Sequence, residues 1–132
     1  MEKLIRGIVD FQVSKADDYR GLFAKLALGQ KPDTFFLACS DSRVAVNVFA
    51  STDPGDLFVM RNVGNIIPAF KQDSSGSSYQ AALEFAVFEL GVKHIVVCGH
   101  SECGGMMAIT DSRLLTVGPR TFVSLLACVR TD

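Results

Sequence analysis

Three short apolar segments constrain the fold of this chain more than any other feature. They cover residues 34–39, 57–61 and 94–98, and each is too short for a helix and almost unbroken in apolar residues. Such runs are typical of strands that are buried on both faces of a parallel sheet. Segments with helical spacing alternate with them along the chain. We therefore predict an α/β fold, a mostly parallel β-sheet flanked by helices.

Helical periodicity marks the segments around these strands. It predicts a short amphipathic helix at the N-terminus, a second helix over 19–28, a third over 79–90 and another that starts near Gly104. Residues 77–80 match a capping box at the start of the third helix. Residues 44–50 are compatible with either a strand or a short helix. This order of elements places helices between consecutive strands, as a parallel sheet requires.

Length and composition favour one compact domain over residues 1–132. Hydrophobic residues make up 48% and charged residues 20% of the chain, which favours a buried core over disorder. No apolar run reaches the roughly 20 residues of a membrane-spanning helix, and the N-terminus lacks an apolar signal segment. We expect a cytoplasmic protein without a membrane partner. The charges are scattered and sum to −1, so no nucleic-acid partner is indicated either.

The cysteines point to metal chemistry at one edge of the sheet. In a chain without a secretion signal, free, metal-bound or catalytic thiols are expected before disulfides. Cys39 ends the first predicted strand, and His100 and Cys103 follow the third in a glycine-rich loop. Carboxyl ends of parallel strands meet at one edge, so these side chains can form a Cys2His zinc site with one open position. The alternative is that they are only packed or hydrogen-bonded; Cys98 is expected to be a small buried residue, and Cys128 has no assigned role.

Asp41 and Arg43 stand two residues apart, directly after Cys39. They can form a surface ion pair, which contributes little. They can also form a dyad in which the Arg43 guanidinium forks onto the Asp41 carboxylate, keeps it ionised and lets it orient a zinc-bound water. Two thiolates neutralise Zn2+, so the water is a weaker acid than in a three-histidine site and needs such help.

Three segments carry a resemblance to a known family. Residues 38–44, 54–65 and 96–106 are similar to the motifs of the β-class carbonic anhydrases, and the similarity extends over about 22–108. The resemblance implies a zinc lyase, a β-carbonic anhydrase-like fold and reversible hydration of CO2 to bicarbonate and a proton by a zinc-bound hydroxide. It also implies one Zn2+ per chain, in a single zinc-binding domain, and a homodimer or higher oligomer.

The resemblance also implies residue roles. The zinc ligands would be Cys39, His100 and Cys103, with Asp41 and Arg43 as the catalytic dyad. Four further positions match substrate-binding positions of the family: Gln30, Phe58, Val63 and Gly104.

Two family types differ in how the fourth zinc position is used. In one type, bicarbonate fills a second pocket and the aspartate moves onto zinc; its members share a Trp three residues before the first cysteine. Here Phe36 stands at that position, although Arg61 matches an arginine of the second pocket. Gln30 stands where the plant-like members place a glutamine. We therefore expect the plant-like, open, water-bound type.

The C-terminal stretch departs from the family. Residues 110–132 do not read as the expected continuation, and we expect the usual C-terminal elements to be shortened or altered. Two alternatives to CO2 hydration follow. The chain can be a catalytically impaired or structural zinc-binding protein, or it can hydrolyse a CO2 analogue such as carbonyl sulfide or carbon disulfide.

Overall fold

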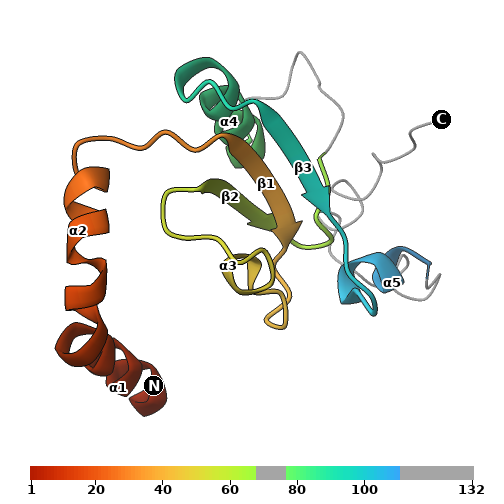
Figure 1. Cartoon of the computed structure of the whole chain (residues 1–132). Helices are drawn as coiled ribbons and strands as arrows, with labels where there is room; N and C mark the ends of the chain where they lie inside the picture. The colour runs from red at the N-terminus through yellow and green to blue at the C-terminus, as the bar shows by residue number, and fades with distance from the viewer. Residues whose placement is uncertain (68–76, 111–132) are drawn as a thin grey trace. The chain divides into compact units, whose positions relative to one another are not determined.

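The structure, a computed structural model, describes residues 1–67 and 77–110 (Figure 1). It divides into two compact units, Met1–Gln30 and Lys31–Asp132. The single domain over 1–132 stays a prediction, and the predictions for the C-terminal stretch beyond Thr110 fall outside the described residues. None of the helices in the described ranges is long and apolar enough to cross a membrane.

The N-terminal unit is helical throughout most of its length. Helix α1 (Glu2–Asp10) leads through a π-helical turn, η1 (Phe11–Lys15), into α2 (Ala16–Leu26). The predicted second helix, over 19–28, therefore begins later and ends later than the observed one. The observed helix ends earlier because the chain tightens there: the N–H of Gly29 bonds to the carbonyl of Leu26, three residues back.

The three predicted strands form one parallel sheet. Strand β1 (Thr34–Cys39) lies between β2 (Leu57–Asn62) and β3 (His94–Cys98), and it pairs in parallel with both. All three arrows in Figure 1 therefore point the same way. The predicted α/β fold with a parallel sheet is confirmed, and β2 is one residue longer than expected. The sheet places Cys39 beside Asn62, at the carboxyl edge.

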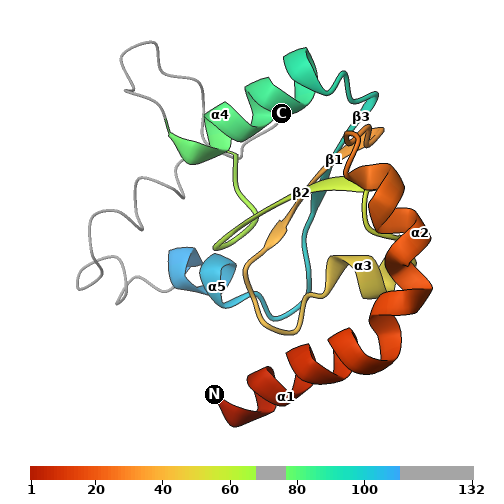
Figure 2. The same cartoon turned by 90° about the vertical axis from the view of Figure 1, so that its left-hand side faces the viewer.

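The two faces of β1 bury alternate residues against different helices. Phe35 and Leu37 pack with Ala86, which belongs to a π-helical turn, η2 (Phe85–Glu89), that continues α4 (Ser78–Glu84). Phe36 and Ala38 pack on the other face with Val46 of α3 (Val46–Phe49). Figure 2 shows α4 and α3 on opposite sides of the sheet. Packing of Val46 thus decides that the ambiguous 44–50 segment contains a helix.

The start of α4 differs from the predicted capping box. Ser77 is the N-cap residue, as expected, but its side chain makes no capping hydrogen bond. Its hydroxyl is buried and has no partner among the described residues. The Gln80 amide points one turn along the helix instead, where it donates to Glu84 at 3.3 Å. The capping position was predictable, whereas the reciprocal side-chain bonds of the box do not form.

Strand β3 is more exposed than its apolar sequence predicts. The Ile95 and Val97 side chains are 52% and 51% exposed, whereas Leu37 and Ala38 of β1 are fully buried. The reason is that neither side chain packs into the two buried clusters that the described residues form on the faces of the sheet. The prediction that β3 is buried on both faces is wrong for these residues.

Candidate metal centre

Two loops at the carboxyl edge bring the predicted ligands together. Cys39 ends β1, while His100 and Cys103 lie between β3 and α5 (Gly104–Thr110). The nitrogen and sulfur ligand atoms of the three residues all lie within 4.8 Å of one another. The two Sγ atoms are 3.7 Å apart, and both cysteines are buried. The parallel register makes this possible, because strand ends adjacent in the sheet supply both loops.

The donor set of this trio fits a zinc ion. Two sulfur atoms and one imidazole are ligands that zinc accepts in tetrahedral geometry. His100 Nε2 is buried without a hydrogen-bond partner among the described residues, which is costly unless another group binds it. The three residues would therefore hold Zn2+ and leave a fourth position open.

The surroundings of Cys39 favour the thiolate form of its side chain. Burial raises the pKa of its thiol, but hydrogen bonds from the backbone of Asp41 and Gly64 and from the side chains of His100 and Cys103 outweigh burial. Together they lower the pKa to about 7. The Asp41 N–H lies 3.4 Å from Sγ. Since the thiolate is the form that binds metal, this surrounding favours a metal ligand.

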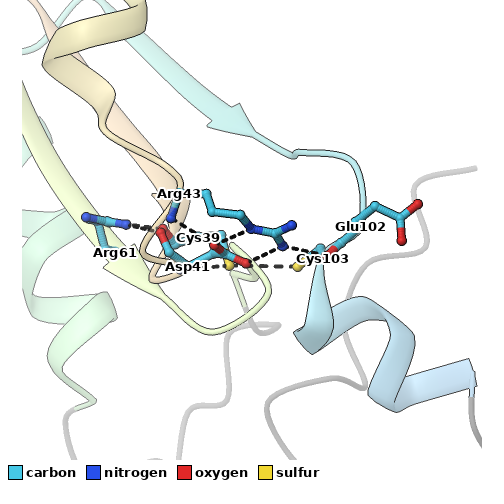
Figure 3. Close-up of polar contacts among 6 residues, drawn as sticks. All are labelled: Cys39, Asp41, Arg43, Arg61, Glu102 and Cys103. Atoms are coloured by element: carbon cyan, nitrogen blue, oxygen red, sulfur yellow. Dashed lines mark hydrogen bonds and ion pairs between the residues drawn. The ribbon is translucent and has the colours of Figure 1, made fainter.

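Asp41 and Arg43 form a two-point ion pair beside the ligands (Figure 3). Arg43 donates from Nε to Oδ1 at 2.9 Å and from Nη2 to Oδ2 at 2.7 Å. Its backbone N–H donates to the same Oδ1 at 3.0 Å. These hydrogen bonds from Arg43 hold the pKa of the Asp41 carboxyl well below its usual range. The forked geometry predicted for the dyad is therefore present.

Arg43 also links the two ligand loops. Its Nη2 donates to the carbonyl of Glu102 at 2.9 Å, directly before Cys103. Glu102 has a positive φ of 54°, so the chain turns sharply where it meets Arg43. A surface ion pair would not require this third contact. The guanidinium therefore couples the Asp41 carboxylate to the loop that carries Cys103.

Arg61 is a second arginine at the same loop, and it contacts backbone rather than carboxylate. It comes from β2 and donates to the carbonyls of Cys39 and Asp41. From the sequence, Arg61 could only be matched with an arginine of a second pocket. The expected open, water-bound form stays a prediction, and the contacts of Arg61 were not foreseen because carbonyls leave no trace in a sequence.

Two glycines allow the loop after β2 to lie against the start of α5. A Cβ atom on Gly105 would lie 2.9 Å from the Gly64 nitrogen and 3.0 Å from its Cα. Gly64 itself has a positive φ of 80°. Asn62 holds this loop closed, since its side chain bonds both the N–H and the carbonyl of Ile66. The same backbone contributes a hydrogen bond to Cys39, so the contact supports the metal ligands.

The comparisons with known proteins agree with this geometry. The chain matches the carbonic anhydrase family over residues 34–126. In solved structures, it is similar to the β-carbonic anhydrase CcaA, with a TM-score of 0.84 and 38% identity over 92% of this chain and 58% of that one. This chain belongs to the β-carbonic anhydrase family.

Further relatives carry the same family name. A carbonic anhydrase of Synechococcus elongatus is 43% identical over 109 residues, which are 83% of this chain and 39% of that protein. A solved chain from a study of two tetrameric β-carbonic anhydrases of Sordaria macrospora also matches, with a TM-score of 0.71 and 38% identity over 86% of this chain and 55% of that one. The chain thus spans between two fifths and three fifths of the length of these relatives.

The predicted substrate residues of this β-carbonic anhydrase occupy different places. Gly104 follows Cys103 directly, and Val63 lies beside Gly105 at the start of α5. Phe58 packs against the Phe35 ring and belongs to the cluster on the α4 face, away from the cluster that contains Cys39. Gln30 ends the N-terminal unit. Their substrate roles stay predictions.

A hollow of about 360 Å³ lies beside the dyad and His100. Apolar and polar side chains share its wall: Arg43, Val44, Phe49, Cys98, His100 and Ser101. Cys98 was predicted to be a small buried residue, but it is only half-buried and lines this hollow. Of the three predicted ligands, His100 is the one that lines this hollow.

Proposed function

We propose that this chain forms the zinc-binding part of an enzyme that catalyses the reversible hydration of CO2 to bicarbonate and a proton. One observation carries the proposal: three ligand atoms within 4.8 Å of one another adjoin a carboxylate held by a forked arginine. Membership of the β-carbonic anhydrase family supports the same reaction. We assign the ligand roles to Cys39, His100 and Cys103.

Zinc, when bound, would lower the pKa of a water molecule and so supply a nucleophile at neutral pH. The thiolates of Cys39 and Cys103 would cancel the charge of the ion and so weaken its effect on the pKa of the water. Polar groups of the protein must therefore contribute more to activating the water than in a three-histidine site. Asp41 is placed for this task. Its carboxylate can accept a hydrogen bond from the water and fix the direction of the lone pair that attacks CO2.

The low pKa of Asp41 decides which role it can have. Because hydrogen bonds from Arg43 keep the carboxyl ionised, Asp41 acts as an acceptor and would not store the released proton at neutral pH. Arg43 fixes its orientation through two parallel bonds. We therefore assign orientation to the dyad and leave proton release to solvent.

The substrate pocket and the assembly are further parts of the proposal. We place Val63 and Gly104 beside the reacting molecule, and we include Gln30 and Phe58 as residues that line the pocket in the assembled enzyme. A homodimer or a higher oligomer would allow a second chain to contribute them. The Sordaria macrospora relatives are described as tetrameric, which supports an oligomer here. Thiol ligands also fit a reducing, cytoplasmic location.

A stopped-flow CO2 hydration assay tests the function, with zinc content measured on the same samples. We expect one equivalent of zinc and turnover well above the buffer rate at alkaline pH. One equivalent of zinc without turnover would overturn the proposal and leave a structural zinc protein. Hydrolysis of carbonyl sulfide or carbon disulfide in the absence of CO2 hydration would reassign the reaction to a CO2 analogue.

A further inference from the structure

Arg61 binds the backbone of the loop that carries the first metal ligand. Its Nε donates to the Cys39 carbonyl at 2.9 Å, and its Nη2 donates to the Asp41 carbonyl at 2.8 Å. Within residues 1–67 and 77–110, the ion pairs involve other arginines. The Arg61 guanidinium binds these two neutral carbonyls instead of a carboxylate. A strand residue therefore reaches across the edge of the sheet to two residues with roles in the site.

The loop divides its polar groups between two sides. The N–H groups of Asp41 and Arg43 point to the anionic side chains, the first to Cys39 Sγ and the second to the Asp41 carboxylate. The carbonyls of Cys39 and Asp41 point instead to Arg61. Figure 3 shows Arg61 and Arg43 at different sides of this loop. One arginine thus holds the carboxylate, and the other holds the backbone from which it extends.

A guanidinium suits this task better than other cationic groups. It is planar and rigid, so two of its donors fix the distance and the relative direction of two acceptors. The Cα–Cβ bonds of Cys39 and Asp41 start from the same residues as the clamped carbonyls. Holding the carbonyls therefore limits the directions that the thiol and the carboxylate can take. A lysine would offer one mobile ammonium in place of the fork.

We infer that Arg61 is a positioning residue that aims the Cys39 thiol and the Asp41 carboxylate at the metal centre by clamping their two carbonyls. The inference rests on the proposed zinc site and extends it to β2. Arg61 acts through the loop and does not touch the reacting molecules. Its removal should therefore change ligand geometry and turnover while leaving the ligands themselves in the chain.

The test compares Arg61→Met, Arg61→Lys and, as a matched control, Arg20→Met in the exposed Arg20–Asp17 pair of the N-terminal unit. Each zinc-free variant is titrated with Co2+, whose thiolate charge-transfer absorption reports the geometry and affinity of the cysteine ligands. For Arg61→Met we expect about 10-fold weaker Co2+ binding and an altered band, as is usual when a group supporting a metal ligand is lost. Arg61→Lys should lie between Arg61→Met and the wild type, and Arg20→Met should match the wild type.

Chemical rescue separates positioning from a general loss of stability. Guanidinium at low millimolar concentration should restore the Co2+ band and part of the zinc-dependent turnover of Arg61→Ala, whose short side chain leaves room for it, whereas methylammonium should not. In zinc-loaded Arg61→Met we expect kcat about 10-fold lower with KM nearly unchanged. Circular dichroism and thermal unfolding establish that the variant is folded under the same conditions.

The outcomes distinguish this inference from the proposed function. A folded Arg61→Met with a wild-type band, affinity and kcat overturns the positioning role, even if the wild type hydrates CO2. A lower melting temperature with an unchanged band overturns it as well, because the role is then only structural. An altered and rescuable band supports the inference even when the wild type proves inactive toward CO2.

Discussion

The two loops that supply the metal ligands are held in place by different means. The loop after β1 is bound by hydrogen bonds to its carbonyls, to the Cys39 thiol and to the Asp41 carboxylate. The loop after β3 follows an exposed strand. It is held by a bond from Arg43 to the Glu102 carbonyl, by the hydrogen bonds of the His100 and Cys103 side chains with Cys39, and by the close approach of Gly105 to Gly64. The position of the first loop is therefore fixed by polar contacts to its backbone and side chains. The position of the second loop depends on backbone packing and on its metal-ligating side chains. We therefore expect substitutions in the two loops to have different effects: loss of metal binding or stability for the second loop, and loss of turnover for the first.

Removal of a ligand from the second loop should have the largest effect. Cys103→Ser replaces a thiolate by a poor zinc ligand, and we expect zinc affinity to fall by more than about 100-fold, beyond the 10–100-fold typical of groups that only support a ligand. Chelator competition with a zinc indicator measures it. Cys98→Ser is the matched control, because Cys98 lines the neighbouring hollow outside the trio. Full zinc retention in Cys103→Ser would refute the ligand assignment.

The first loop should lose turnover without losing metal. Asp41→Asn keeps the shape of the side chain but removes its charge, so we expect zinc content to stay at one equivalent while kcat falls on the order of 100-fold. Asp17→Asn in the exposed Asp17–Arg20 pair serves as the control and should be neutral. Stopped-flow kinetics with metal analysis on the same sample decide the matter, and unchanged turnover would remove Asp41 from the mechanism.

The packing of the second loop can be tested with two neighbouring glycines. A methyl group on Gly105 would press on the Gly64 backbone at 2.9 Å, whereas one on Gly104 meets nothing within 4 Å. We expect Gly105→Ala to lower the free energy of unfolding by about 1–3 kcal/mol, as overpacking usually does. Gly104→Ala should be neutral or slightly stabilising. Urea denaturation of the zinc-free variants compares them, and equal stability of the two would contradict the close contact.

An effect no larger than that of Gly105→Ala should appear in the pH dependence of stability of the zinc-free protein. Burial raises the pKa of the Cys39 thiol, but its hydrogen bonds lower the pKa from 9.0 to about 7 in the folded chain. The unfolded chain binds more protons between these values, so stability should rise from pH 7 to pH 9 and be lost as the pH falls through 7. The expected gain is roughly 1–3 kcal/mol relative to Cys39→Ser. Urea titrations at both pH values measure it, and parallel pH curves for the two proteins would contradict the shift.

Several parts of the fold and the site follow from the sequence by itself. The strands at 34–39 and 94–98 were predictable because unbroken apolar runs between helical segments have few other solutions. The approach of Cys39 to His100 and Cys103 also followed, since parallel strands end at one edge. The forked pairing of Asp41 with Arg43 was one of two open alternatives, and their spacing made it possible.

The tertiary structure decided what depends on neighbours distant in the chain. Packing of Val46 against β1 turned an ambiguous segment into a helix. Ile95 and Val97 stay exposed despite their apolar character, because neither packs into the buried clusters of the described residues. The clamp of Arg61 joins a side chain to carbonyls 20 and 22 residues away. Every residue carries a carbonyl, so no sequence pattern shows which ones a guanidinium will bind; only the folded chain brings them within reach.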